Sequence, residues 1–252
     1  MQENVVISVR GLVTRFGEQV IHDKLDLDVY RGEVLGVVGG SGTGKSVLMK
    51  TMVGLMQPAA GVIDVLDTRI GGGSNGGPAV ESRWGVLFQG GALFSSLTVA
   101  QNVMIPLKEH TDLAPDLISE IASYKIAMVG LPPGACTKYP SEISGGMRKR
   151  AGLARALAMD PEILFLDEPT AGLDPIGAAA FDSLIRGLQQ SLGLTVVMIT
   201  HDLDTLVATC DRIAVLVDHQ VVTGTFQELL DNPHPWIQEY FHGPRARAAQ
   251  PH

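Results

Sequence analysis

Short apolar runs recur along the chain and predict buried strands. The clearest runs cover residues 34–38, 85–88, 163–166, 195–200 and 213–217. Helical patterns lie between most of these runs. Strands that alternate with helices in this way are typical of an α/β fold with a parallel sheet.

Two other regions depart from this alternation. Runs at 5–9, 25–29 and 61–66 predict an antiparallel flank around the first helix. Between about 98 and 160 helical patterns replace strands, and the clearest helix covers 144–159, before Pro161. We therefore expect a helical lobe at 98–160 within one domain, 5–242, followed by a short tail, 243–252. A chain of 252 residues is near the upper size for a single hydrophobic core.

Composition and charge restrict the class of protein. The net charge of -8 and the isoelectric point near 5.3 argue against a nucleic-acid partner, which would require a basic face. Cys136 and Cys210 match no metal or redox spacing and are interpreted as reduced thiols in a cytosolic protein. We find neither a signal peptide nor 18 uninterrupted apolar residues, so the chain is not expected to span a membrane by itself.

The first chemical motif lies between the run 34–38 and the next helical pattern. Its residues are Gly39, Gly40, Ser41, Gly42, Thr43, Gly44, Lys45 and Ser46. They fit G-x-x-x-x-G-K-[ST] in the strand-loop-helix context of a phosphate loop. Backbone N–H groups, a helix N-terminus and the Lys45 ammonium would bind phosphate, and the Ser46 hydroxyl would bind Mg²⁺. We predict nucleoside triphosphate binding; the alternative is a glycine-rich turn before an ordinary helix.

A second glycine-rich stretch has a different interpretation. Gly71, Gly73 and Gly76 fit G-x-G-x-x-G, but Pro78 and another strand follow instead of a helix. The position where an acidic residue would contact a ribose holds Ser96. We therefore predict a surface loop here and not a dinucleotide site.

Two carboxylates follow the apolar run 163–166. Asp167 is expected to hold Mg²⁺ through its water shell, and Glu168 to polarise the attacking water. Ligands in open α/β sheets bind at the carboxyl ends of strands, which supports this interpretation. The alternative is a solvated acidic turn.

Further motifs make the chain resemble an ABC-type ATPase over nearly its whole length. Ser144, Gly145 and Gly146 open a helix and resemble the signature motif, although alone they would be a turn and helix cap. Gln89 ends a strand and resembles the Q-loop glutamine that links the magnesium site to the helical lobe. A strand-end polar residue is the plain alternative for Gln89.

Three more residues extend the resemblance. Asp174, in the stretch 171–174, resembles the D-loop aspartate, or else belongs to an ordinary Asp-Pro turn. His201 resembles the switch histidine that reaches the γ-phosphate, or else is structural and pairs with a carboxylate such as Asp202. Phe16 matches the aromatic residue that stacks on adenine, or else is a core residue of the flanking strand.

The resemblance implies a P-loop NTPase sheet with an antiparallel β flank and an inserted helical lobe. It implies ATP and Mg²⁺, with Ser46, Gln89 and Asp167 at the metal. In this family each ATP lies between the phosphate loop of one ATPase domain and the signature of another. Because this chain has one copy of each motif, the resemblance implies a pair with a second copy of itself.

A closer resemblance is to the MlaF-type ATPase of Mla lipid transporters, carried by residues 91–94, 143–150 and 241–245. Met147 departs from the glutamine usual in ABC proteins but resembles the Mla-type pattern. The resemblance implies an MlaE-like permease, an MlaD-like MCE-domain protein and an MlaB-like STAS-domain protein. It places the chain on the cytoplasmic face of the inner membrane, bound through the permease, in a system that maintains outer-membrane lipid asymmetry.

Other function classes remain open at this point. One is an ABC importer ATPase for another substrate. Another is a soluble ABC ATPase that acts on DNA or ribosomes, although such proteins commonly carry two ATPase domains or long coiled-coil insertions. A nucleotide-dependent scaffold without hydrolysis is disfavoured by Glu168 and His201.

Overall fold

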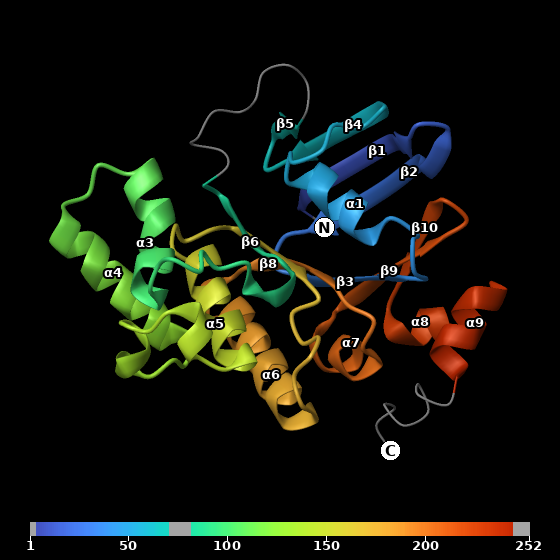
Figure 1. Cartoon of the computed structure of the whole chain (residues 1–252). Coiled ribbons are helices and arrows are strands. Elements are labelled where there is room, and N and C mark those ends of the chain that lie inside the picture. Colours follow the sequence, from blue (N-terminus) through green and yellow to red (C-terminus); the bar gives the residue numbers. More distant parts are fainter. Residues whose placement is uncertain (1–3, 71–81, 244–252) are drawn as a thin grey trace. The chain divides into compact units, whose positions relative to one another are not determined.

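The computed structural model describes residues 4–70 and 82–243 (Figure 1). It divides into two compact units. The first unit combines residues up to 77 with those from 195 onward, and the second unit covers 78–194. The glycine-rich stretch 71–76 and the end of the predicted tail, 244–252, lie outside the described residues.

The first unit contains the predicted antiparallel flank, a four-stranded sheet in the order β2-β1-β4-β5 (Figure 1). Its strands are β1 (Val5–Phe16), β2 (Gln19–Tyr30), β4 (Ala60–Val65) and β5 (Thr68–Ile70). The predicted runs 5–9 and 25–29 were too short, because β1 and β2 pair along almost their whole length. The register of β1 shifts between Val9 and Leu12, which breaks the alternation of buried and exposed residues.

The first unit also holds strands in the order β10-β9-β3-β8, where β3 runs parallel to both β8 and β9. They are β3 (Val34–Gly39), β8 (Thr195–Ile199), β9 (Arg212–Val217) and β10 (Gln220–Gly224). The apolar runs of β3 and β8 are buried throughout, apart from partial exposure of Gly39, as a strand covered on both faces requires. Parallel neighbours end at the same edge, so β3 and β8 deliver the phosphate loop and His201 to one edge.

Strands β5 and β10 were missed by the sequence analysis. Each follows a two-residue hairpin turn, Leu66-Asp67 before β5 and Asp218-His219 before β10. All four turn residues have positive φ, between 48° and 64°. Such turns usually contain Asn-Gly or Asp-Gly, and the absence of glycine from both hid these hairpins.

Helices pack on the second sheet of the first unit. They are α1 (Lys45–Met52), α7 (Leu203–Thr209), α8 (Phe226–Leu230) and α9 (Pro235–His242). Leu206 of α7, together with Ile237 and Phe241 of α9, belongs to one buried cluster with Val38 of β3 and Val215 of β9. The core of this sheet thus fixes α9 near the strand that leads into the phosphate loop.

The second unit joins a parallel strand pair to a group of helices. The strands are β6 (Trp84–Leu87) and β7 (Ile163–Asp167). The helices are α3 (Val99–His110), α4 (Pro115–Met128), α5 (Gly145–Ala156) and α6 (Pro175–Leu192), with short 3-10 turns at Gln89–Gly91, Pro133–Ala135 and Pro140–Glu142. Helices α3, α4 and α5 pack together (Figure 1) and fall within the stretch predicted as a helical lobe. The domain limits 5–242 and 98–160 stay predictions.

Helix α5 is shorter than the predicted 144–159. Ser144 is its N-cap, and Leu157 ends it. Asp160 then takes a positive φ of 49°, which a continuing helix does not allow. The apolar residues after Ala156 therefore belong to the turn that leads into β7.

Helix α5 and strand β6 approach so closely that two glycines are required between them. A Cβ on Gly85 would lie 2.1 Å from the Ala156 carbonyl oxygen, and one on Gly152 would lie 2.8 Å from that of Gly91. Both distances are well inside van der Waals contact. The helix that begins at Ser144 is therefore held directly against the strand that leads to Gln89.

In the part of the chain that the structure describes, no helix combines the length and apolar character needed to cross a membrane.

Candidate functional site

The phosphate loop depends on a glycine at the start of α1. Gly44 is the N-cap of α1 and has a φ of 95°, which disfavours other residues. A Cβ there would lie 2.3 Å from Cγ2 of Ile21 and 2.6 Å from Nε2 of His22. Gly44 carries no side chain that could cap the first turn, so the helix presents its positive dipole end to the loop.

The Lys45 side chain curls back into the loop. Its Nζ donates to the carbonyl oxygens of Gly39 and Gly40, both at 2.8 Å. The Thr43 hydroxyl also donates to Gly40, at 3.0 Å. These bonds hold the ammonium inside the curve of the backbone, where N–H groups and a full positive charge suit a phosphate chain. The loop therefore brings a positive charge and a helix N-terminus together at one place, and its contact with a triphosphate stays a prediction.

A cavity of about 260 Å³ lies beside this loop in the first unit. Its lining residues are Gln19, Val20, Ile21, Ser41, Gly42, Thr43, Leu216, Asp218 and His219. Phe16 ends β1 and is 55% exposed, so the alternative that it is a core residue is wrong. Stacking of adenine on Phe16 stays a prediction.

Helix α9 connects His201 to the phosphate loop. The Tyr240 hydroxyl donates to the His201 carbonyl oxygen at 3.1 Å, and its ring stacks on Trp236 at a centroid distance of 4.9 Å. Trp236 in turn packs beside Gly40. A Cβ added to Gly40 would lie 3.6 Å from Nε1 of Trp236. Asp202 caps α7 by accepting the Asp204 N–H at 3.0 Å. The sequence analysis gave α9 no part in this site.

In the second unit, β7 ends at the two predicted carboxylates. Asp167 is its last residue, and Glu168 has a φ of 50°. The left-handed region is unusual for a glutamate and costs about 1–2 kcal/mol, so surrounding contacts must hold it. The chain thus turns sharply after Asp167.

Lys149 lies against this turn. Its Nζ donates to the carbonyl oxygen of Glu168 at 3.0 Å and to that of Pro169 at 2.7 Å. Burial lowers the pKa of Lys149, whereas the Glu168 carboxylate acts in the opposite direction. The sequence analysis quoted Lys149 within the signature stretch but assigned it no role. The sequence signal for such a role was the position of Lys149, one helical turn after Gly145 on the same helix.

The signature residues open α5 as predicted. The Ser144 hydroxyl caps the helix by accepting the Met147 N–H at 3.2 Å, and both Ser144 and Gly145 are exposed. Arg150 fixes the helix through a 2.7 Å bond to the Val129 carbonyl oxygen. Gly146 lies partly buried near Leu173 of the following loop. The N-terminal end of α5 is therefore anchored but accessible, and its contact with nucleotide stays a prediction.

Gln89 and Asp174 are both exposed in the second unit. Gln89 starts a 3-10 turn that departs from helical geometry at Gly90. The Asp174 carboxylate accepts the Gly177 N–H at 2.9 Å and caps α6. The structure thus gives Asp174 the local role of an N-cap, and its nucleotide contact stays a prediction.

The predicted metal ligands fit the chemistry of Mg²⁺. Ser46 is exposed on the first turn of α1 in the first unit, Gln89 and Asp167 belong to the second unit, and their meeting at one ion stays a prediction. All three offer oxygen, and Mg²⁺ in nucleotide sites takes few protein ligands and completes its shell with phosphate and water. Accordingly, the described residues contain no cluster of three His, Cys, Asp or Glu that would make a self-contained metal centre. When bound, Mg²⁺ would neutralise charge on the β- and γ-phosphates.

His22 packs against the phosphate loop at Gly44. It is fully buried on β2, its Nδ1 lies 2.8 Å from the Thr14 hydroxyl oxygen, and no described group hydrogen-bonds its Nε2. Burial, with a contribution from the positive charge of His219, lowers the pKa of His22 to about 4. The imidazole is therefore neutral at physiological pH.

Comparisons with known proteins identify relatives along nearly all of the chain. A family model described as ABC transporter matches residues 22–171. Over 245 residues the chain is 38% identical to the intermembrane phospholipid transport system ATP-binding protein MlaF of Haemophilus influenzae, covering 96% of this chain and 92% of that one. It is 39% identical over 247 residues to the probable ribonucleotide transport ATP-binding protein mkl of Mycobacterium leprae, covering 97% of this chain and 71% of mkl.

Solved structures share this fold. The structure of cbiO1 from Clostridium perfringens, part of the ABC transporter complex cbiONQ, has a TM-score of 0.81 and 29% identity, covering 96% of this chain and 97% of cbiO1. The dimeric post-hydrolysis state of the ATP-binding cassette MJ0796, bound to ADP and Pi, has a TM-score of 0.79 and 25% identity, covering 87% of this chain and 98% of that chain.

Two substitutions separate binding from hydrolysis. Lys45→Ala should abolish ATP retention, because the loop loses the charge that faces the phosphates. Glu168→Gln should retain ATP but lose turnover by about 100-fold or more, because an amide cannot accept a proton from water. Filter retention of labelled ATP and steady-state hydrolysis measure both effects. Lys50→Ala, which changes an exposed lysine on the same helix, is the control, and near-normal turnover by Glu168→Gln would remove it as the base.

The lowered pKa of His22 makes folding stability depend on pH in a defined window. Between pH 6.5 and about 4 the unfolded chain binds more protons than the folded chain, so the free energy of unfolding falls as pH falls. From neutral pH to about pH 5 this contribution should be about 2 kcal/mol. Urea unfolding of the parent and of His22→Asn, which keeps a partner for Thr14, measures it. Equal pH dependence of the two proteins would contradict the prediction.

Proposed function

The chain belongs to the ABC transporter family as an ATP-binding, ATP-hydrolysing subunit, and we propose that the transporter it drives moves phospholipid. The observation that carries the cargo is the match to MlaF, 38% identical over 245 residues, together with the Mla-type stretches 91–94, 143–150 and 241–245. The Met147 signature supports the same choice.

We assign the chemistry as follows. The residues 39–46 hold the phosphates, with Phe16 under adenine. Glu168 polarises the attacking water, and the side chains of Gln89 and His201 lie beside the γ-phosphate. Ser46, Gln89 and Asp167 provide the oxygen ligands for Mg²⁺. Preorganised charge, from the Lys45 ammonium and helix N-termini, is expected to supply most of the rate enhancement.

The second unit carries features of an interface with a second copy of the chain. Ser144 and Gly145 are exposed at the positive end of α5, where N–H groups suit an anion. Ile176, two residues after Asp174, is 84% exposed, which is unusual for a large apolar side chain. The cassette MJ0796, with 25% identity, is dimeric. We propose that Ser144, Gly145, Gly146 and Asp174 act on the nucleotide held by the second copy.

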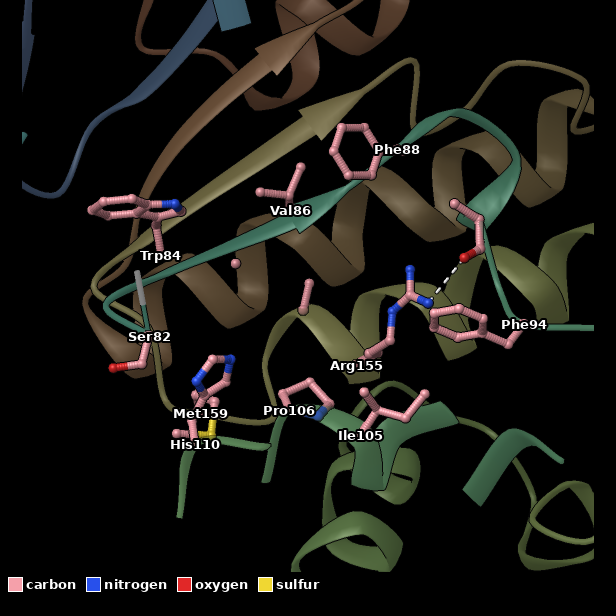
Figure 2. Close-up of a pocket in the computed structure, with 13 residues that line it drawn as sticks. Ser82, Trp84, Val86, Phe88, Phe94, Ile105, Pro106, His110, Arg155 and Met159 are labelled. Atoms are coloured by element: carbon pink, nitrogen blue, oxygen red, sulfur yellow. Dashed lines mark hydrogen bonds between the residues drawn. The ribbon is translucent and has the colours of Figure 1, made fainter. Parts of the chain in front are cut away.

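A separate apolar cavity in the second unit suits a permease. It has a volume of about 460 Å³ and lies among β6, α3 and the end of α5 (Figure 2). Its larger lining residues are Trp84, Val86, Phe88, Phe94, Ile105, Pro106, His110, Arg155 and Met159. Phe94 is 55% exposed and therefore does not belong to the core. A concave apolar surface of this kind is typical of a protein interaction site.

Arg155 holds the loop that carries Phe94. Its guanidinium donates to the carbonyl oxygens of Ala92 at 2.9 Å and Gly91 at 3.2 Å, and it lies 5.9 Å from the Phe94 ring centroid (Figure 2). Burial lowers the pKa of Arg155, yet the group stays charged at neutral pH. The loop is thus fixed in a form that presents its aromatic ring, and we propose that a helix of an MlaE-like permease docks there.

The remaining partners follow from the same assignment. We propose that the permease holds the chain at the cytoplasmic face of the inner membrane and links it to an MlaD-like MCE protein. An MlaB-like STAS protein completes the assembly. A transporter of ribonucleotides is the second candidate, because mkl reaches the same level of identity.

If a permease docks at this cavity, Phe94→Asp should weaken binding to the permease and leave the fold of the chain intact. A charge at the rim should reduce co-purification with the permease by about tenfold or more, because a desolvated carboxylate opposes the interface. Circular dichroism of the isolated chain should be unchanged. Leu192→Asp changes a side chain that is 43% exposed at the end of α6 and is the matched control. Equal co-purification of both variants would contradict the docking site.

The cargo is tested in cells. Deletion of the gene should increase phospholipid at the cell surface and raise detergent sensitivity, and the parent gene should reverse both effects while Lys45→Ala should not. Surface phospholipid and uptake of labelled ribonucleotides are measured in the same strains. Unchanged surface phospholipid with lost ribonucleotide uptake would replace the lipid assignment with the second candidate and leave the ATPase assignment intact.

A further inference from the structure

Lys149 is a buried cation whose bonds are both to backbone at the candidate catalytic turn. The residue is 6% exposed and lies on α5, and its Nζ reaches the carbonyl oxygens of Glu168 and Pro169. Burying an ammonium is costly unless hydrogen bonds replace its hydration. A leucine or methionine would fill this place without that cost, so the position of the charge calls for an explanation.

The two hydrogen bonds of Lys149 hold a stretch of backbone whose conformation is unfavourable by itself. Glu168 has a φ of 50°, and its carbonyl oxygen accepts from the Ala171 N–H at 3.3 Å as well as from Lys149. Residues in the left-handed region persist when their surroundings over-determine them. The charged donor is the stronger of the two bonds to this carbonyl. Lys149 thus fixes the peptide that follows Glu168, and with it the direction of the Glu168 side chain.

The same helix carries the signature residues. Gly145 and Lys149 are four positions apart, so they share a face of α5 and lie about 6 Å apart along its axis. Helix α5 cannot shift easily, because Gly85 and Gly152 place it in backbone contact with β6 and the following turn. A rigid element of one helical turn therefore joins the signature end to the glutamate turn of the same chain.

We propose that Lys149 is a positioning residue that aims the Glu168 carboxylate and couples it to the occupancy of the signature end of α5. The proposal rests on the assignment of Glu168 as the base. A ligand bound at Ser144 and Gly145 acts on the Glu168 peptide through this rigid helical turn and the two Lys149 bonds. The residue acts on hydrolysis and not on nucleotide affinity, since both bonds of its ammonium are to the glutamate turn.

The test compares Lys149→Met with Lys149→Arg in the full chain. Methionine matches the length of lysine without its donors, and arginine keeps donors and charge. Lys149→Met should lower kcat by about 10- to 100-fold with KM for ATP and filter-retained ATP within about twofold, and Lys149→Arg should recover much of kcat. The matched control is Lys125→Met, which removes another buried ammonium of the second unit, on α4, whose bond is to the Asp160 carboxylate, and it should change kcat less than about threefold.

The outcomes are separable. A kcat of Lys149→Met within about threefold of the parent, while Glu168→Gln is inactive, overturns the proposal and leaves the base assignment intact. Near-normal turnover by Glu168→Gln shows instead that the assignment of the base has failed. A merely structural role would lower melting temperature and ATP retention together, which also overturns the proposal. If Lys149→Met does not fold, Lys149→Gln and Lys149→Arg replace it, and equal kcat of both with the parent overturns the proposal.

Discussion

Backbone contact between α5 and β6 is the steric constraint around which the second unit is arranged. Gly85 faces the Ala156 carbonyl, and Gly152 faces the Gly91 carbonyl and the Leu87 side chain, so a larger residue at either glycine would clash and the helix has one position relative to the strand. That contact sets where the helix begins after Ser144 and where the turn at Gln89 follows the strand. Interiors are close-packed, and a helix seated on glycine does not slide without a clash. The functional residues of this unit are therefore placed by packing before any ligand contributes.

In the first unit, too, a glycine allows close packing, here beneath the phosphate loop. Gly44 lets the loop lie directly on Ile21 and His22, so a strand of the antiparallel sheet supports the phosphate loop. Helix α9 approaches the loop through Trp236 and reaches the His201 carbonyl oxygen through Tyr240. Neutral His22, the stacked pair of Trp236 and Tyr240 and backbone hydrogen bonds support the loop without adding negative charge to it.

Several charged side chains in both units hold backbone. Lys45 and Lys149 donate to main-chain carbonyl oxygens, and Arg150 and Arg155 do the same at the two sides of α5. Such bonds orient loops more firmly than exposed ion pairs, because few exposed pairs contribute more than about 1 kcal/mol. The cavity that we assign to the permease depends on this arrangement, since Arg155 sets the loop that presents Phe94.

The sequence by itself determined the strands with continuous apolar runs, the antiparallel flank and the phosphate loop, because each of these is encoded in residues close together in the chain. It also placed Asp167 and Glu168 at the end of a strand and Ser144 at the start of a helix. Hairpins through Leu66-Asp67 and Asp218-His219 were missed, because positive φ without glycine leaves no sequence signal. Only the tertiary structure decided that Phe16 and Phe94 are exposed, that Asp174 caps a helix and that Lys149 reaches Glu168. Exposure and long-range hydrogen bonds depend on which distant segments pack together, and periodicity along one segment does not record that packing.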